Sequence, residues 1–446
     1  MPRWEEMTPD ERRAQLWTSW CAQANATFSS LAAQKAYQER TTRVRDAIEL
    51  KKAPDRVPIF PVVGWFPAYY AGMTPYDMMY DTAKLHAAYK KYVVDFQPDA
   101  HMGIMVAPPG KFFEILDYKL YAWPGHGVSK DVGYQAIEGE YMTAEEYDAL
   151  IADPTDFFLR AYLPRVFAAL GPLRMLSPLT NILEIYGGFS AANILPFGLP
   201  DVQASLKALM AAGEETLKWI GTVAAFEKEM TELGYPDFFG GGCKAPYDTL
   251  SDTLRGTKGI MVDIYRRPEK AIKAMEAIVP LMVRMGAGGA KQNGNPIVFM
   301  PLHKGADGFM SDAQFKKFYW PTLKAVLLGL IDEGCVPFCW AEGGFNTRLD
   351  VIKDFPKGKM VWGFDKTDMA RVKKVLGPVC CIGGNVPQSL LDTGTVDEVK
   401  AHIKGLINTC GKSGGYIVMT GASFDWTRPE NVKAMIDATK EYGVYK

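Results

Sequence analysis

The fold is decided by a series of apolar runs late in the chain: PIVFMPLH (296–303), VPFCWAEG (336–343), MVWGFD (360–365), VCCIGGNV (379–386) and YIVMTGA (416–422). Segments with helical spacing of apolar residues separate these runs, and the connections between them are short. Each run is almost continuously apolar, which is typical of strands buried on both faces of a parallel sheet. The alternation of strand and helix therefore predicts an α/β fold.

Every run ends in a polar or glycine-containing signature, namely His303, Glu342, Asp365, Asn385 and Gly421. In a barrel of parallel strands, such ends form the rim of the active site. An open, doubly wound sheet would show the same alternation. The barrel is favoured because no GxGxxG motif follows the first strand.

Outward from these runs, VPIFPVV (57–63) has the texture of a buried first strand, and the residues before it have that of helices. Thr8 can cap the first helix together with Glu11. We therefore expect an N-terminal helical extension over residues 1–53 and a (β/α)₈ TIM-type barrel over residues 54–446. The middle of the chain, at 110–290, is the least regular part and carries no motif, although a long helix is expected from Val202 to about Leu233.

Composition restricts the classes of partner. Fifty basic and 51 acidic side chains give a net charge of −1, so no electrostatic signature of nucleic acid or membrane binding is present. No apolar stretch is long enough to span a bilayer, and the N-terminus lacks the layout of a signal peptide. The seven cysteines are scattered, with no CxxC pair, which favours a reducing cytoplasm.

Several stretches resemble the uroporphyrinogen-decarboxylase superfamily, which includes the haem-pathway decarboxylase and the corrinoid and coenzyme-M methyltransferases. They are PDRVP (54–58), FMSDAQFKKFYWPTLKAVLLGLIDEG (309–334), CCIGGNVPQSLLDTGTVDEVK (380–400) and GGYIVMTGASFDWTRPENVKAM (414–435). The resemblance implies a TIM barrel and covers most of the last 150 residues together with the region of the first strand.

The chain departs from both branches of that superfamily. The arginine-bearing RQAGRY-like signature of the decarboxylase is missing, and the corresponding region reads GWFPAYYAGMTPYD (64–77). The zinc methyltransferases carry His-x-Cys at one strand end and a further cysteine in the last glycine turn. Those places here hold Trp340, Ala341 and Glu342, and Gly421, Ala422 and Ser423. The thiolate zinc site is therefore absent in that form.

Glu342 and His303 are the candidate catalytic residues because both directly follow predicted barrel strands. Each could act as a general acid or base or as a metal ligand, with zinc as the metal. The alternatives are a carboxylate that only bonds nearby backbone N–H groups and a histidine packed under its loop. Alternation along the strand places Trp340 and Glu342 on one face and Cys339 on the other.

A second group of residues is predicted to contact the substrate. Asn385 follows two glycines that let a ligand approach the backbone, and four aromatic residues could wall a pocket. His101 and Asp95 share a segment that we expect to be strand and loop. For the aromatic residues core packing is the alternative, and for Asp95 it is helix capping. The full set is Asn385, Trp65, Phe66, Tyr70, Trp340, His101 and Asp95.

The resemblance implies a methyltransferase that moves a methyl group from a small substrate, such as an aromatic or methoxylated compound, to a corrinoid. That cofactor, a cobalamin, is expected on a separate corrinoid protein. The alternatives are a decarboxylase or lyase of an unsaturated or aromatic acid and a non-catalytic barrel that binds a tetrapyrrole. A homodimer is one possible assembly. We expect His303, Glu342 and Asn385 to open into one cavity.

Overall fold

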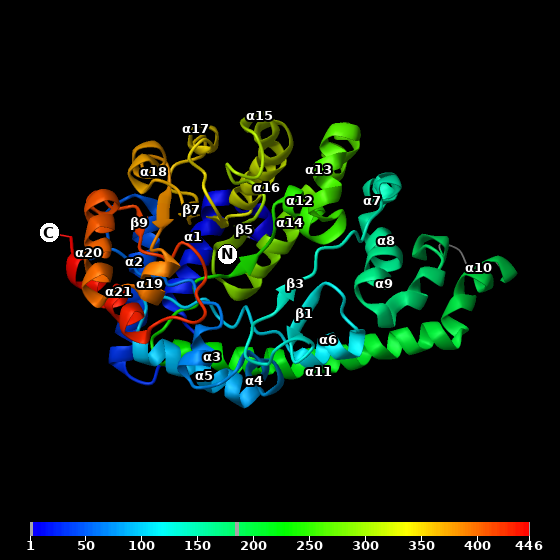
Figure 1. Cartoon of the computed structure of the whole chain (residues 1–446), viewed down its shortest axis with the longest axis horizontal. Helices are drawn as coiled ribbons and strands as arrows, with labels where there is room; N and C mark the ends of the chain where they lie inside the picture. The colour runs from blue at the N-terminus through cyan, green and yellow to red at the C-terminus, as the bar shows by residue number, and fades with distance from the viewer. Residues whose placement is uncertain (1–2, 183–186, 446) are drawn as a thin grey trace.

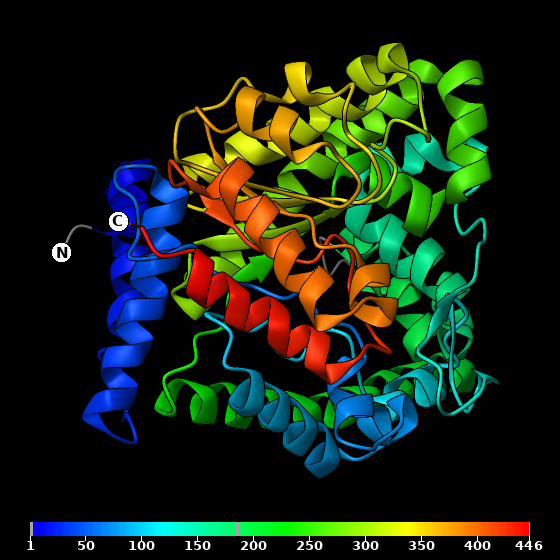
Figure 2. The same cartoon turned by 60° about the vertical axis from the view of Figure 1, so that its left-hand side comes forward.

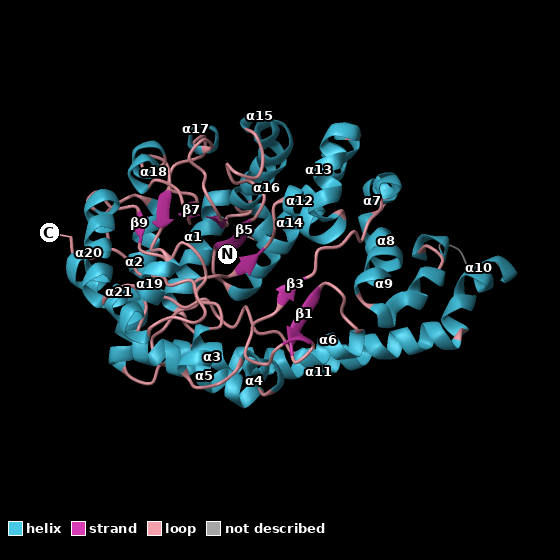
Figure 3. Cartoon of the chain, in the orientation of Figure 1, coloured by secondary structure: helices cyan, strands magenta, loops and turns pink. Residues whose placement is uncertain are grey.

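The computed structural model describes residues 3–182 and 187–445 (Figure 1). Helices surround a central sheet, as Figure 3 shows by colour. The sheet has six parallel strands in the order of the sequence. They are β4 (Gly241–Gly242), β5 (Ile297–Leu302), β6 (Val336–Ala341), β7 (Val361–Phe364), β8 (Cys381–Gly384) and β9 (Tyr416–Ile417). All residues of β6 are buried, as its apolar sequence predicts.

Two more segments close this sheet into a ring. Ile59 forms a parallel bridge with Val418, which directly follows β9. The N–H of Asp99 donates to the carbonyl of Ile59 (3.1 Å), and His101 forms a parallel bridge with Asp237, just before β4. The backbone contacts therefore run through eight chain segments and return to the first. The predicted α/β barrel is confirmed.

The first of these segments, predicted as a strand over 57–63, is held by isolated bridges and not by a continuous ladder. Pro58 and Pro61 explain the difference, because a proline has no N–H to donate to a neighbouring strand.

Helices cover the outside of the ring. Those that follow the first segment are α3 (Phe66–Tyr70), α4 (Pro75–Tyr80) and α5 (Thr82–Phe96). Those that follow β4 and the later strands are α12 (Pro246–Asp248), α13 (Gly256–Arg266), α14 (Pro268–Asn293), α15 (Asp312–Gln314), α16 (Trp320–Asp332), α17 (Leu349–Ile352), α18 (Met369–Val375), α19 (Gln388–Thr393), α20 (Val396–Leu406) and α21 (Pro429–Tyr442). In the described ranges no helix is both long and apolar enough to cross a membrane.

The irregular middle of the sequence forms a lobe beside the ring (Figure 1). Its elements are α6 (Gly110–Leu116), a small sheet of β1 (Tyr121–Pro124), β2 (Gly127–Val128) and β3 (Gln135–Ala136), then α7 (Tyr147–Ala152), α8 (Pro154–Phe157), α9 (Leu163–Val166), α10 (Gly187–Ile194) and α11 (Pro200–Glu232). The long helix expected from Val202 is α11, which begins two residues earlier and runs along one edge of the molecule (Figure 1).

The interior of the ring is rich in aromatic residues. Two N-terminal helices cover one of its two open ends. Rings of Phe60 and Phe238 stack 4.0 Å apart, and Trp340 lies in the same buried cluster. The helices α1 (Pro9–Ala22) and α2 (Leu31–Glu49) lie side by side (Figure 2). Trp17 and Trp20 of α1 join the cluster beside the first residues of β5, β6 and β7. The helices therefore cover the amino-terminal ends of the strands, and the carboxyl ends are left on the opposite side.

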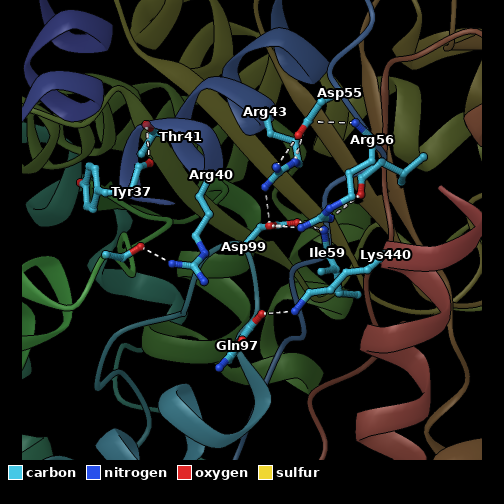
Figure 4. A network of polar contacts seen from close by, with 12 residues as sticks. Tyr37, Arg40, Thr41, Arg43, Asp55, Arg56, Ile59, Gln97, Asp99 and Lys440 are labelled. Carbon is cyan, nitrogen blue, oxygen red and sulfur yellow. Dashed lines mark hydrogen bonds and ion pairs between the residues drawn. The ribbon is translucent and has the colours of Figure 1, made fainter. Parts of the chain in front are cut away.

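An ion-pair network fixes α2 to the ring (Figure 4). Asp99, whose side chain is 1% exposed, binds the guanidinium groups of Arg43 at 2.7 Å and Arg56 at 2.6 Å. Its second oxygen also accepts from the N–H of Ile59 (2.9 Å). Arg43 reaches on to Asp55 at the surface, where that carboxylate is 60% exposed. One buried carboxylate thus joins α2, the first ring segment and the second.

Candidate functional site

Four polar residues stand at the same edge of the sheet, because each follows the carboxyl end of a parallel strand. His303 follows β5, Glu342 follows β6, Asp365 lies directly after β7 and Asn385 directly after β8. Trp340 belongs to the cluster inside the ring, whereas Cys339 belongs to the cluster beneath the helices. Glu342 continues the inward alternation of Trp340, as the sequence predicts.

Two carboxylates flank the ring of His303. Its Nδ1 atom lies 2.5 Å from Oδ2 of Asp252, and its Nε2 atom lies 3.7 Å from Oε1 of Glu342. Asp252 belongs to the segment Thr249–Leu254 that follows α12, and it also binds Lys244 at 3.0 Å. A carboxylate on one ring nitrogen orients the imidazole and leaves the other nitrogen free to exchange a proton.

Asp248 holds the loop that carries the histidine. Its carboxylate is completely buried and accepts from the backbone N–H of His303 (3.0 Å), the N–H of Lys304 (3.1 Å) and the hydroxyl of Tyr319 (2.7 Å). We call Asp248, Asp252, His303 and Glu342 the strand-end site. Because the oxygens of Asp248 accept hydrogen bonds from the loop backbone, Asp248 positions the loop. The side chains of the other three residues remain available for chemistry.

The charges at the strand-end site shift its pKa values. Burial lowers the pKa of His303, but the hydrogen bond to Asp252 and the charge of Glu342 raise it more, so it lies above its ordinary value. Burial raises the pKa of Glu342, and the opposing charge of His303 does not cancel this effect. Burial also opposes ionisation of Asp252, but the bonds from His303 and Lys244 hold its pKa far below the usual range. The site therefore favours an ionised Asp252 beside a protonated His303.

Asn385 is at the same edge, but its amide N–H groups are already used. They donate to the carbonyls of Asp365 (2.9 Å) and Thr367 (2.9 Å). The carboxylate of Asp365 in turn accepts from the N–H of Gly343 (3.1 Å). These bonds tie the ends of β7 and β8 together, and donation from Asn385 to a ligand stays a prediction. A cavity shared by His303, Glu342 and Asn385 stays a prediction.

The four aromatic residues predicted to wall the pocket do not all lie near the strand-end site. Trp65 follows the first ring segment, and its backbone N–H donates to the carboxylate of Asp425 (2.7 Å), a residue that lies beyond β9. Phe66 instead packs edge-on against Tyr92 and Phe96 of α5, and the hydroxyl of Tyr70 donates to Asp95 (2.9 Å). The structure does not bring Phe66 and Tyr70 together with the strand-end site. Trp340 lies inside the ring, two residues before Glu342 on β6, and its indole N–H donates to the carbonyl of Gly421 (3.2 Å).

Asp95 and His101 lie away from the strand-end site. The strand and loop predicted over 93–105 begin later than expected, because α5 continues to Phe96. Asp95 therefore lies on the surface of that helix, paired with Lys91 at 2.6 Å. A lysine one turn earlier stabilises such a helical position. His101 is buried between the ring and α11, where it lies 3.7 Å from Glu227.

Sequence reasoning missed Asp248, Asp252 and Lys244. They follow GGGC (240–243), a glycine cluster whose sequence is typical of a turn or loop. The run YPDFFGGGCK (235–244) contains β4, and its small residues hide the strand because they replace the usual branched apolar side chains. A polar sequence such as KAPYDTLSD directly after that run is the signal that could have revealed the site.

Zinc does not fit the pair Glu342 and His303. Asp252 and Glu342 lie at opposite nitrogens of the His303 ring, so the three groups do not converge on one point. A zinc site needs at least three converging protein ligands. Cys339 is buried among the helices, where burial holds the pKa of its thiol well above the ordinary value. No chemical step at this site is therefore derived through a metal.

A comparison with solved structures agrees with this architecture. A methyltransferase from Methanosarcina mazei superposes with a TM-score of 0.58 and 15% identity, over 90% of this chain and 98% of that chain. At this identity the likeness shows the fold. A B12-independent methionine synthase from Shewanella sp. W3-18-1 gives a TM-score of 0.31 and 10% identity, over 45% of this chain and 60% of that chain. No curated protein matched the sequence.

The family model of uroporphyrinogen decarboxylase (URO-D) matches residues 216–442, just over half of the chain. This match includes β4 to β9 and every residue of the strand-end site. The chain belongs to the uroporphyrinogen decarboxylase (URO-D) family.

Proposed function

We propose that this protein is a methyltransferase that takes a methyl group from a small substrate, such as an aromatic or methoxylated compound, and passes it to a corrinoid. The observation that supports it is the row Asp252, His303 and Glu342 at the carboxyl ends of the strands. The fold likeness to a methyltransferase adds an analogy, which by itself carries no chemistry.

Asp252, His303 and Glu342 together provide a general acid, which protonates the heteroatom that leaves the methyl group. When a C–O or C–N bond to a methyl group breaks, its electron pair stays on the oxygen or nitrogen, which then needs a proton. Asp252 accepts the Nδ1–H of His303, so the Nε2–H of the protonated ring can donate to that atom. Glu342, on the Nε2 side, can relay or replace the proton because its pKa is raised.

The charge of the site favours methyl transfer over decarboxylation. Glu342 is close enough to Asp248, Asp252 and Asp365 for all three carboxyl groups to raise its pKa. A substrate carboxylate placed there would add one more negative charge, whereas a neutral ether would not. The decarboxylase signature with its arginine is also missing from the sequence at 64–77.

A corrinoid, when bound, supplies the nucleophile that takes the methyl group. We propose that it is delivered by a separate corrinoid protein, which would dock at the carboxyl ends of the strands. The chain's own part is to bind the methyl donor, orient His303 and hold its proton.

The test is a methyl-transfer assay with the purified protein, cob(I)alamin and a panel of methoxylated aromatic compounds. We expect conversion of cob(I)alamin to methylcobalamin, followed by its absorbance, with no release of carbon dioxide. Carbon dioxide release from an aromatic or unsaturated acid would support a decarboxylase instead. Tight binding of a tetrapyrrole without any turnover would support a binding protein.

Replacing Glu342 by glutamine is expected to lower turnover at least about tenfold, the lower part of the range for general acid–base catalysis. Glutamine keeps the size and hydrogen bonding of the side chain but removes its titration. Steady-state kinetics and a thermal melt would measure activity and folding together. Unchanged turnover would make Glu342 a structural residue and leave catalysis to His303.

Replacing Asp252 by asparagine is expected to move the pH profile. Asp252 helps to raise the pKa of His303, and the protonated ring is the active form, so activity falls as pH rises through that pKa. Without the negative charge, the fall should occur at lower pH. We would measure kcat/KM against pH for both proteins and for Asp350→Asn, a surface change on α17. An unshifted alkaline limb in Asp252→Asn would contradict the assignment of His303 as the acid.

A further inference from the structure

A second cluster of titratable residues lies apart from the strand-end site. His101 comes from the second ring segment, Glu227 from α11 and Asp237 from the residues just before β4. One ligand atom of each lies within 4.8 Å of the others. Among the described residues no other set of three or more histidine, cysteine, aspartate or glutamate side chains meets this condition. Asp237 precedes β4 and Asp252 follows it, so the two sites are at opposite ends of that strand.

His101 is buried and lacks a partner on one side. Its side chain is 2% exposed, and the N–H of Gly103 donates to Nδ1 (3.1 Å). Nε2 is directed at Glu227, 3.7 Å away, and forms no hydrogen bond within the described part of the chain. The ring of Phe226 packs edge-on against it at 5.3 Å and holds its orientation. A buried ring nitrogen without a partner is costly unless something else occupies the space in front of it.

The two carboxyl groups meet in front of a residue without a side chain. A Cβ atom at Gly103 would lie 3.2 Å from Oε1 of Glu227 and 3.5 Å from Oδ2 of Asp237. Burial raises the pKa of Asp237 to about 7, and burial together with the charge of Asp237 holds that of Glu227 well above its ordinary value. Two acidic groups in one buried space repel each other unless a proton or a cation is shared between them.

A cavity of about 970 Å³ gives access to this cluster. Glu227 and Asp237 line it, and so do the side chains of Gln23, Asn293 and Asn295. The carboxylate of Glu227 is 27% exposed toward it. A ligand can therefore reach the cluster from solvent, and water can complete its coordination.

We propose that His101, Glu227 and Asp237 bind a divalent transition-metal ion, with water from the cavity as the remaining ligands. Two carboxylates and a neutral imidazole match the charge of such an ion. The imidazole nitrogen favours zinc, and the two carboxylates also suit manganese, whereas magnesium and calcium prefer ligand sets made only of oxygen. The site is independent of the proposed methyl transfer, and its test does not use enzymatic activity.

Metal binding sets the protonation of the histidine. With Nδ1 accepting from Gly103, the proton of the neutral ring sits on Nε2. A metal on Nε2 requires that proton on Nδ1 instead, so the bond from the N–H of Gly103 is given up. The carbonyl of Tyr235 also contacts the ring. Changing one hydrogen bond of the ring costs little free energy. Structural metal sites gain considerably more than this on binding.

The ion would strengthen the contact between the second ring segment and β4, which is weak in the barrel. The second ring segment and β4 are joined by the single bridge between His101 and Asp237, and α11 crosses beside it. A metal bound by all three elements stabilises the folded protein in proportion to its concentration over Kd.

The experiment is titration calorimetry of the metal-stripped full-length protein with ZnCl₂, MnCl₂ and MgCl₂, together with thermal melts. We expect one zinc or manganese ion per chain, weaker binding of magnesium, and a melting temperature that rises with zinc. Glu227→Gln and Asp237→Asn should each weaken zinc binding at least about tenfold. Without metal, Glu227→Gln should melt no lower than the unmodified protein, because it removes a buried charge.

The matched control is Glu232→Gln. Glu232 lies on the same helix and lines the same cavity, and its carboxylate pairs only loosely with Lys228 at 3.9 Å. This variant should bind zinc as the unmodified protein does. Equal zinc affinity in Glu227→Gln and the unmodified protein, or no saturable binding at all, would overturn the proposal. Magnesium binding as tight as zinc would overturn the role of His101 as a ligand.

Discussion

Replacing His303 by glutamine is expected to lower kcat by about 10²- to 10⁴-fold, the usual contribution of a general acid. Glutamine can still accept or donate a hydrogen bond toward Asp252, but it cannot carry the proton that the leaving heteroatom needs. The change leaves the backbone N–H of residue 303 in place, so its bond to Asp248 (3.0 Å) should persist and the loop should keep its shape. Stopped-flow or steady-state methyl transfer at saturating substrate would measure the loss.

A histidine elsewhere supplies the control for this change. His86 lies on α5 and pairs with Glu229 at 3.1 Å, away from the strand ends. His86→Gln should keep the activity of the unmodified enzyme. If His303→Gln kept most of its kcat, the ring would be packed under its loop for structure alone, and the acid would have to be sought elsewhere.

Replacing Asp99 by asparagine is expected to reduce the free energy of unfolding by about 3–5 kcal/mol, the cost of leaving a buried charge without its partner. The guanidinium of Arg56, 14% exposed, loses this carboxylate, and that of Arg43, 7% exposed, keeps Asp55 alone, so little water can replace Asp99. Burial opposes ionisation of Asp99, but the charges of Arg56 and Arg43 outweigh it and lower its pKa. Its stabilising effect is therefore fully present above the ordinary pKa of an aspartate and is lost as pH falls through the lowered value.

Asp55→Asn is the matched control, because Asp55 binds the same Arg43 but is 60% exposed. An exposed ion pair contributes at most about 1 kcal/mol, so this variant should lose little. Urea denaturation followed by circular dichroism and tryptophan fluorescence would compare the three proteins. Equal losses in the two variants would mean that the network owes nothing to burial of Asp99.

The late strands could be predicted from sequence because each is a continuous apolar run that ends in a polar residue or a glycine. PIVFMPLH contains β5, and its last residue, His303, marks the edge where the site lies. The identity of that edge follows from parallel strand direction alone, which is why the sequence places Glu342 beside His303. The alternation that directs Trp340 inward and Cys339 outward follows from the pleat of the strand.

The residues that complete the site could not be predicted, for a local reason. β4 has only two residues, both glycine, so the pattern that marks the other strands is missing there. Asp252 therefore had no strand end to define its place, although it is the closest partner of His303. Likewise, an apolar segment that contains Asp95 can form a helix or a strand, and the choice is made by packing of α5 against its neighbours.

The closure of the ring has a consequence for how the protein is made. The N–H of Val62, in the first ring segment, donates to the hydroxyl of Thr420 (3.2 Å), 358 positions later in the chain. At a synthesis rate of about 5–20 residues per second, the first segment waits on the order of tens of seconds for that partner. During this time one backbone edge of the first ring segment has no strand to pair with, and the side chain of Phe60 has no closed ring to pack into. In a ribosome-bound chain, the apolar first segment therefore stays without its native neighbour until the residues around Val418 emerge.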